Sequence, residues 1–421
     1  MDGQTKVPRF FFKSSRAGAG HNHSDNNSIE LCAYGRHLLV DREAPPYNVD
    51  HLPVDERKDF PWVLEYKGEE ARWTANNLLI DGCGQLPGVN NKGYNSTIPN
   101  QSWYTSEAFD FVQGTWTRTF KTGEPMDLEE VRSYATKYGA TIMEASAQLA
   151  AATQLNAQPQ QSFEATHTRQ VIYLRQANAW IVTDWASRND GQKAKAITQL
   201  WHFPSPRLEQ NAKKTAGYSK ILSPGFEKEQ VVCDELEQRI LTNNPANVNL
   251  AILSAVPGKI QYIRSFGDKY PYRGWANASA SMISGYVPAV DLQVVYTPEQ
   301  PIVTVLVPIP QGEKYEQRVK SFSKDFKNGQ TRIKLKFGDG TDVEYVVANS
   351  LTELTTGKAK ANAEGLLLMT SQGAVQGLSM SRFDKNFAFQ LLNNKMSITQ
   401  DIKVPGGFTW QDTLQGLVPK Y

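Results

Sequence analysis

The chain has 421 residues, of which 40% are hydrophobic and 21% are charged, a composition typical of a globular protein and not of a disordered one. Its 45 basic and 43 acidic residues leave a formal charge of +2, so no strong field argues for nucleic acid or an acidic membrane as partner. The sequence holds no apolar run of about 18 residues that would span a bilayer, and its first residues lack the apolar segment of a signal peptide.

The first pattern that carries chemistry lies in residues 20–28, where His21, His23 and Asp25 occupy alternate positions. Neutral imidazole and carboxylate groups ligate zinc-like ions, and histidine is the side chain best suited to move protons near pH 7. A motif this short also fits a solvated polar loop before a strand.

Residues 29–41 follow with an apolar alternation that predicts a hairpin. Gly35-Arg36 is expected to turn the chain from the first strand into a second one that ends at Asp41. The start of the first strand and the end of the second lie at the same edge of a hairpin. The pattern therefore predicts that Asp41 lies close to the histidine loop, although pairing alone does not bring it within bonding distance of His23.

Strand patterns dominate the rest of the chain. They occupy residues 169–174, 179–184, 249–255, 290–296, 302–307, 331–337 and 343–348. Residues 125–160 differ, because Asp127 to Glu130 has the spacing of a capping box and the residues that follow are rich in Ala, Glu and Leu. We predict an all-β fold, a large antiparallel β-sandwich with a small helical insertion around 125–160.

The sandwich is expected to occupy residues 1–421. A composition change at residues 307–310, followed by a charged run, offers a division into a main sandwich (1–310) and C-terminal strands (311–421). Strand patterns resume within about twenty residues, so we interpret the charged run as a long surface loop.

Several segments in the first half of the chain match family signatures. The first group comprises Lys13-Ser14-Ser15, the HxHxDxNS pattern from His21 to Ser28, Ala33-Tyr34-Gly35 and Leu38-Leu39-Val40-Asp41. The second signature runs from Thr74 to Gln85 and is similar to HNTVLVDGxGQ, and residues 169–175 and 179–184 follow as a strand pair. Together and in this order, the segments resemble the heparinase II/III-like polysaccharide lyases, which are related to oligoalginate lyases and dermatan sulfate epimerase-like proteins.

The resemblance implies a helical toroid followed by a large antiparallel β-sandwich, with the active site between them. This chain begins where the sandwich would begin. We therefore expect the toroid to be absent from it and to act as a partner, either upstream or on a separate chain. By resemblance, the protein would be periplasmic or secreted and its other partner an acidic polysaccharide.

The chemistry that the resemblance implies is β-elimination on a uronic-acid polysaccharide. A base removes the proton α to the sugar carboxylate, and the 4-linked glycosidic oxygen leaves with help from an acid. Positioned donors in a water-poor cleft stabilise the enolate-like charge. Uronate epimerase chemistry, which shares the proton abstraction, and a noncatalytic carbohydrate-binding or structural module are the alternatives. The resemblance does not select among heparan-, chondroitin- and alginate-type polymers.

Matched residue by residue, the resemblance assigns the catalytic acid–base role to His21. Tyr47 and Tyr66 are both candidates for the family's loop tyrosine, and each also fits simple packing with its hydroxyl at the surface. Further residues near the two signatures are candidates for binding the substrate. These are Asn22, Asn27, Trp73 and Gln85.

The family's metal site takes a histidine and an aspartate that match His23 and Asp41. The third ligand, a histidine of the second signature, falls on Ala75, which has no ligand atom. Zinc normally takes three or four protein ligands, so we expect zinc to be absent or weakly held. The substitutes that would complete the site are His51, His37 and Asp25.

Two other histidines, His167 and His202, are expected to be buried core residues. For His202 the reason is its place at a strand end among aromatic residues. Aromatic residues near the motifs are candidates for stacking on sugar rings, although most of the nine tryptophans are expected in the core. These candidates are Trp73, Trp103, Trp116 and the segment 270–275.

Overall fold

The structure is a computed structural model, of which about 60% is strand and 11% helix. The residues it describes are 8–13, 25–41, 75–86, 100–105, 107–122, 127–137, 139–157, 159–206, 225–269, 272–278, 283–295, 300–383, 388–391, 397–399, 408–413 and 416–420. The helix content lies far below the average of about one third for globular proteins. The predicted all-β class is therefore confirmed.

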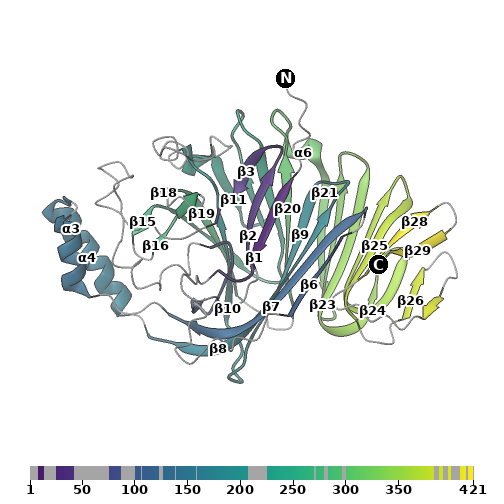
Figure 1. Cartoon of the computed structure of the whole chain (residues 1–421), viewed down its shortest axis with the longest axis horizontal. Helices are drawn as coiled ribbons and strands as arrows, with labels where there is room; N and C mark the ends of the chain where they lie inside the picture. The colour runs from purple at the N-terminus through teal and green to yellow at the C-terminus, as the bar shows by residue number, and fades with distance from the viewer. Residues whose placement is uncertain are drawn as a thin grey trace.

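A large antiparallel sheet forms the middle of the molecule (Figure 1). Within the described residues it has nine strands, and its longest members, β7 and β8, pair over thirteen positions. In spatial order the strands are β11 (Val231–Asp234), β12 (Arg239–Thr242), β13 (Asn249–Ala255), β20 (Ile302–Ile309), β9 (Ala179–Arg188), β8 (Ser162–Leu174), β7 (Phe109–Lys121) and β5 (Gly84–Gln85), with β6 (Asn100–Thr105) also paired to β7.

One face of this central sheet packs against smaller sheets. In the described part of the chain these are the sheet β1 (Arg9–Lys13), β2 (Ser28–Ala33), β3 (Arg36–Leu39) and the sheet β14 (Ile260–Phe266), β19 (Pro288–Val295), β10 (Ala196–His202), β4 (Leu78–Ile80). Their apolar residues, such as Leu31 and Leu292, share one buried core with Val171, Trp180 and Val182 of the central sheet.

The opposite face packs against a C-terminal antiparallel sheet. Because side chains alternate along a strand, Ile172 and Ile181 face this second core, together with Leu335, Tyr345 and Leu367. Its strands are β21 (Val319–Lys327), β22 (Gln330–Phe337), β23 (Thr341–Thr355), β24 (Ala359–Ser371), β25 (Ala374–Phe383), β28 (Phe408–Thr413) and β29 (Gly416–Lys420), with β26 (Ala388–Leu391) and β27 (Ser397–Thr399) paired beside β24. The central sheet is thus covered on both faces, in agreement with its long runs of buried residues.

Short elements complete the described fold. They are the hairpins β15 (Asp268–Lys269) with β16 (Tyr272–Arg273) and β17 (Trp275–Ala278) with β18 (Ile283–Tyr286), the short helix α6 (Tyr315–Arg318) and the 3₁₀ turn η2 (Lys228–Gln230).

The hairpin predicted for residues 29–41 is formed by β2 and β3. Its turn residues are Tyr34 and Gly35, with φ of 50° and 72°, one position earlier than the sequence suggested. Two consecutive residues with positive φ form the turn whose twist matches that of the strands. The first strand also pairs with β1 on its other side, a partner that the sequence pattern did not predict.

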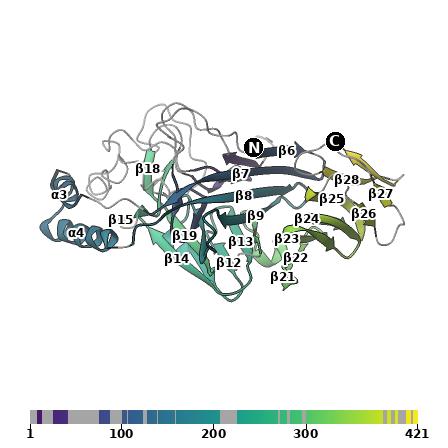
Figure 2. The same ribbon diagram turned by 90° about the horizontal axis from the view of Figure 1, so that it is seen from below.

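The predicted helical insertion is present as α3 (Leu128–Lys137) and α4 (Ile142–Asn156). The side chain of Asp127 accepts hydrogen bonds from the backbone N–H groups of Glu129 and Glu130, which caps α3. Thr141 and Glu144 form a reciprocal capping box at the start of α4. Figures 1 and 2 show the two helices side by side at one end of the molecule, away from the C-terminal sheet. No helix in the described ranges is long and apolar enough to cross a membrane.

A buried carboxylate in β19 makes stability depend on pH. Asp291 is fully buried, and its Oδ2 lies 2.7 Å from Nη1 of Arg273. Burial raises the pKa of Asp291 from 3.8 to about 6, because desolvation outweighs the attraction of Arg273 and Asp268 adds repulsion. The folded protein therefore binds this proton more tightly than the unfolded chain does, and stability falls as the pH rises between these two values.

The variant Asp291→Asn is expected to lack this loss of stability. Between pH 4 and pH 6, the free energy of unfolding should fall by roughly 2–3 kcal/mol less in the variant than in the wild type. Urea unfolding at a series of pH values measures the difference, with the exposed Asp325→Asn as a control that keeps the wild-type slope. Parallel curves for wild type and Asp291→Asn would contradict the assignment.

Candidate functional site

The predicted site residues divide into two groups. Several of them lie outside the described residues: His21, Asn22, His23, Tyr47, His51, Tyr66 and Trp73. Their roles stay predictions. The described residues of the two signatures meet on the central sheet.

The end of the first signature is anchored beside β1. Lys13 and Asp25, which flank residues 14–24, form an ion pair in which the Asp25 side chain is only 6% exposed. The backbone N–H of Asn27 donates to the carbonyl of Lys13 at 2.6 Å. Asn27 has a φ of 63°, a conformation that asparagine adopts more readily than most residues. The two ends of the segment that carries His21 and His23 are therefore held together.

The Asn27 side chain fixes this loop to the central sheet. It is fully buried, and its Nδ2 donates to the carbonyl oxygens of Gly114 and His167, each at 3.2 Å. Gln85, another predicted binding residue, is also buried and donates from Nε2 to the carbonyl of Asn26 at 2.8 Å. Both side chains hold the first signature in place, and their contact with a substrate stays a prediction.

The second signature lies directly against the end of the β2–β3 hairpin. Asn76 Nδ2 donates to the carbonyls of Ile29 and Val40, each at 2.8 Å, and its backbone N–H donates to Asp41 Oδ1 at 3.3 Å. Ala75 is fully buried one residue before Asn76. The position of the third metal ligand in the family pattern is thus adjacent to the bond that reaches Asp41.

The described residues do not fit a three-ligand zinc site. Ala75 offers no donor atom, and Asp25 is engaged by Lys13. His37 pairs with Cys32 beside the hairpin turn, away from the hairpin end that carries Asp41. The part of the chain that the structure describes contains no group of three or more His, Cys, Asp or Glu side chains suited to a metal ion.

His202 is buried and hydrogen-bonded, as expected for a core histidine. It also contacts the second signature, because its backbone N–H and its Nδ1 both lie within hydrogen-bond distance of Asn76 Oδ1, at 2.7 and 3.1 Å. The carbonyl of His202 accepts from the backbone N–H of Val40 at 3.0 Å. No sequence pattern predicts this contact, although Phe203-Pro204 marks the end of β10 at His202.

Arg169 connects the two signatures. It is fully buried in β8, and its Nη1 donates to the carbonyl oxygens of Asn27 at 2.8 Å and Asn76 at 2.6 Å. Its Nε and Nη2 donate to the two carboxylate oxygens of Asp184 at 2.7 and 3.0 Å. A bidentate pair of this kind fixes the orientation of the guanidinium as well as its position.

Asp184 is the centre of a buried polar network. His167 Nε2 lies 2.7 Å from Oδ1, and Gln199 Nε2 donates to Oδ2 at 2.7 Å. Burial disfavours the charged carboxylate, but Arg169 and the hydrogen bonds from His167 and Arg169 outweigh it and hold the pKa of Asp184 well below its usual value. Burial lowers the pKa of His167, which favours the neutral imidazole. The predicted core role of His167 is confirmed.

Comparisons with known proteins found similarity only among solved structures: no family model matches the chain, and no curated protein does. The heparan sulfate lyase HepC from Pedobacter heparinus matches with a TM-score of 0.48 and 15% identity over 83% of this chain and 40% of that one. A heparinase III gene product matches with a TM-score of 0.44 and 14% identity over 81% of this chain and 39% of that one. This chain spans less than half the length of these proteins, and at such values the likeness assigns no activity to it.

Proposed function

We propose that this chain is the β-sandwich portion of a polysaccharide lyase that cleaves uronic-acid-containing glycans by β-elimination. The observation that supports the proposal is the meeting of the two signatures, about fifty residues apart in sequence, on the single guanidinium of Arg169. Segments that matched the family signatures only by chance would not be expected to contact the same side chain in the fold. The wider surroundings agree, since Asp41 and Asn76 join the same two segments a second time.

In this proposal His21 transfers the proton at the glycosidic bond. The flanking residues Lys13 and Asp25 form an ion pair, and the backbone N–H of Asn27 donates to the Lys13 carbonyl. Tyr47 or Tyr66 supplies the second proton-transfer group from the sandwich, and a helical toroid domain supplies the remaining base and the opposite wall of the cleft. Pre-positioned donors and acceptors of this kind contribute most when they need no rearrangement during the reaction.

The test is an elimination assay on heparan-, chondroitin- and alginate-type polymers, followed by the ultraviolet absorbance of the unsaturated product. The chain alone is expected to show negligible activity, and the chain combined with a helical toroid domain of this lyase type is expected to show elimination. The toroid alone is the control. Cleavage by the isolated chain would show that the division of labour between the two parts is wrong.

A second candidate is a noncatalytic carbohydrate-binding or structural module, which Ala75 favours because it removes a metal ligand. The two candidates differ in the assay above. A chain that binds acidic glycans but eliminates none of them in the presence of a toroid would be such a module. Uronate epimerase chemistry would instead exchange the α proton with solvent without forming an unsaturated product.

We propose that zinc is not held tightly by the wild-type chain, because zinc with two protein ligands is weakly bound. Ala75→His places an imidazole beside the Asn76–Asp41 contact and is expected to raise zinc affinity at least tenfold. Elemental analysis after dialysis measures bound zinc, with Ala75→Leu as a control of similar bulk. Tight one-to-one zinc in the wild type would show that another residue completes the site.

A further inference from the structure

An aromatic cavity lies on the same face of the central sheet as the candidate site, farther along the strands. Its volume is about 570 Å³, within the range of about 300–1,000 Å³ that small-molecule pockets occupy. Its nearest lining residues are Val112 on β7 and Val171 on β8. They lie two residues from Gly114 and Arg169 of the candidate site, a distance of about 7 Å along the strands. The cavity is thus a neighbour of the candidate site and shares none of the residues described there.

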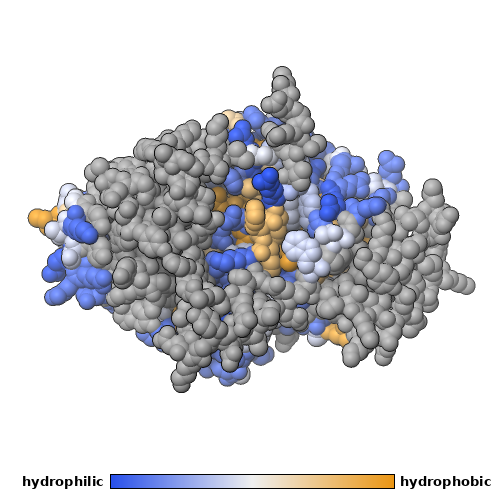
Figure 3. All heavy atoms as spheres, viewed as in Figure 1, coloured by the Kyte–Doolittle hydropathy of each residue, from blue (hydrophilic) through white to orange (hydrophobic). Residues whose placement is uncertain are grey.

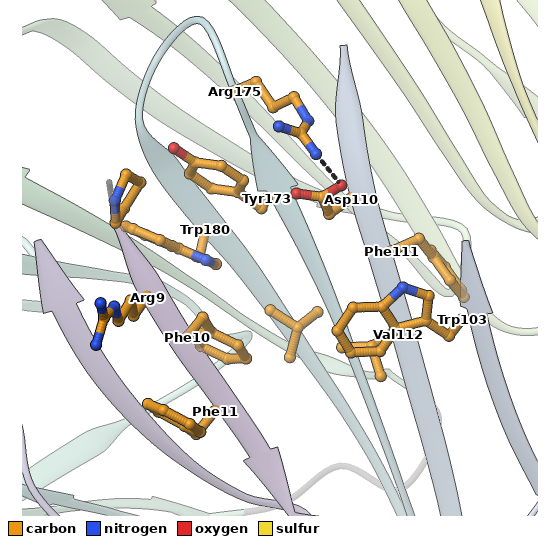
Figure 4. A pocket seen from close by; sticks show the side chains of 12 residues that line it. Arg9, Phe10, Phe11, Trp103, Asp110, Phe111, Val112, Tyr173, Arg175 and Trp180 are labelled. Atoms are coloured by element: carbon orange, nitrogen blue, oxygen red, sulfur yellow. Dashed lines mark hydrogen bonds and ion pairs between the residues drawn. The ribbon is translucent and has the colours of Figure 1, made fainter. Parts of the chain in front are cut away.

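The walls are aromatic rings held at fixed angles. Phe10 stacks on Trp180 with ring centroids 6.0 Å apart, and Tyr173 stacks on the same tryptophan at 4.6 Å. Figure 4 shows these three rings on one side of the cavity and Trp103 with Val112 on the other. A rigid stack presents an apolar surface without the entropic cost of ordering it on binding.

The open side of the cavity exposes aromatic surface to solvent. Trp103 is 68% exposed and Phe11 is 59% exposed. Figure 3 shows apolar side chains gathered in the middle of this face, in the region of β1. Large exposed aromatic side chains grouped in a concave site mark a binding surface.

Trp116, another predicted sugar-stacking residue, is not part of this cavity. It is buried, and the guanidinium of Arg118 lies over its ring at 4.2 Å from the centroid.

Charged groups also line the cavity, with Arg175 and Asp110 on one side and Arg9 on another (Figure 4). Arg175 Nη2 donates to Asp110 Oδ1 at 2.6 Å, and the two side chains remain 43% and 26% exposed. A guanidinium has five donors, so Arg175 keeps donors for a ligand, and the second oxygen of Asp110 can accept from a hydroxyl group. Arg9 adds a further cation to the lining. The three side chains together carry one net positive charge.

We propose that this cavity binds an acidic saccharide, with sugar rings against Trp103 and Phe11 and a carboxylate or sulfate at Arg9 or Arg175. A pyranose ring has an apolar face of C–H groups that fits an aromatic ring and a rim of hydroxyl groups that needs paired donors and acceptors. Arginine binds planar anionic groups in two-point contacts. The concave shape favours a small ligand over a flat protein surface. The inference extends the proposed function and rests on it only for the choice of a uronate polymer as probe.

Calorimetric titration of the chain with a uronate tetrasaccharide tests the proposal, with a neutral tetrasaccharide as the second probe. Trp103→Ala is expected to weaken binding of the acidic probe at least tenfold. The double substitution Arg9→Gln with Arg175→Gln is expected to remove the preference for the acidic probe over the neutral one. The matched controls are Leu236→Ala and Arg132→Gln, exposed residues far along the chain from the cavity, which should bind as the wild type does.

Because Trp103 is exposed, Trp103→Ala is expected to keep the wild-type melting temperature, which separates lost binding from unfolding. Absence of heat with either probe at millimolar concentration, or wild-type affinity in Trp103→Ala, would overturn the proposal. So would a Trp103→Ala variant that keeps saccharide binding and loses association with the helical toroid, since the cavity would then be a protein interface. Binding needs no turnover. If the chain binds the acidic probe but shows no elimination with the toroid, the cavity proposal holds and the proposed function is wrong. If it shows elimination but does not bind the probe at this cavity, the proposed function holds and the cavity proposal is wrong.

Discussion

Replacing Arg169 with methionine is expected to lower the free energy of unfolding by about 3–5 kcal/mol, the cost of removing one partner from a buried ion pair. Asp184 would stay fully buried without its guanidinium. The carbonyls of Asn27 and Asn76 would also lose the donor that joins the two signatures. Urea unfolding of purified wild type and variant measures the difference.

The matched control is Arg332→Met, which removes an arginine from a pair with Glu344 on neighbouring strands. Arg332 Nη1 lies 2.7 Å from Glu344 Oε1, but the two side chains are 29% and 13% exposed. Partly solvated pairs contribute about 0–1 kcal/mol. Adding Asp184→Asn to Arg169→Met should restore part of the loss, because the uncompensated charge is gone. Equal losses for Arg169→Met and Arg332→Met would show that the buried network contributes no special stability.

The pH dependence of this loss gives a second measurement. In the wild type the pKa of Asp184 is lowered in the folded state, so its contribution to stability is present above the unfolded value of 3.8 and is lost as the pH falls. Without Arg169, burial raises that pKa, and the sign reverses. The variant should therefore come closer to the wild type as the pH is lowered toward 4.

Much of the fold could be predicted from local patterns in the sequence. The apolar alternation before Tyr34-Gly35 predicted the β2–β3 hairpin because a strand that buries one face needs period-two spacing. The capping residue Asp127 marked the start of the helical insertion for an equally local reason. The glycines at 338 and 340 likewise suit the connection between β22 and β23. Each of these features is decided within a few residues.

The candidate site depends on contacts that no local pattern contains. Arg169 lies in an alternating strand, where an arginine normally indicates a solvated face. It is buried because Asn27 and Asn76, 142 and 93 positions away in the sequence, cover it. The pairing of β1 with β2 was missed for the same kind of reason, since Phe10, Phe11 and Phe12 form an unbroken apolar run without alternation. The signatures indicated which segments matter, and only the fold showed what joins them.

The largest expected effect on activity is at His21. In a sandwich combined with a helical toroid, His21→Ala is expected to reduce the rate of elimination on the order of 10²-fold or more, as for the loss of one acid–base group. The described residues on either side of residues 14–24 are anchored, because Lys13 pairs with Asp25 and the backbone N–H of Asn27 donates to the Lys13 carbonyl.

The comparison with His37→Ala separates catalysis from structure. His37 belongs to the same hairpin but lies near its turn, so its loss should leave the rate of elimination within a few-fold of wild type. The pH profile supplies the sharper criterion, because a single acid–base group near neutrality produces a limb that disappears in His21→Ala and persists in His37→Ala. If His21→Ala retains both the wild-type rate and both limbs of the profile, the histidine is structural. The resemblance that assigned its role would then describe the fold of this loop and not its chemistry.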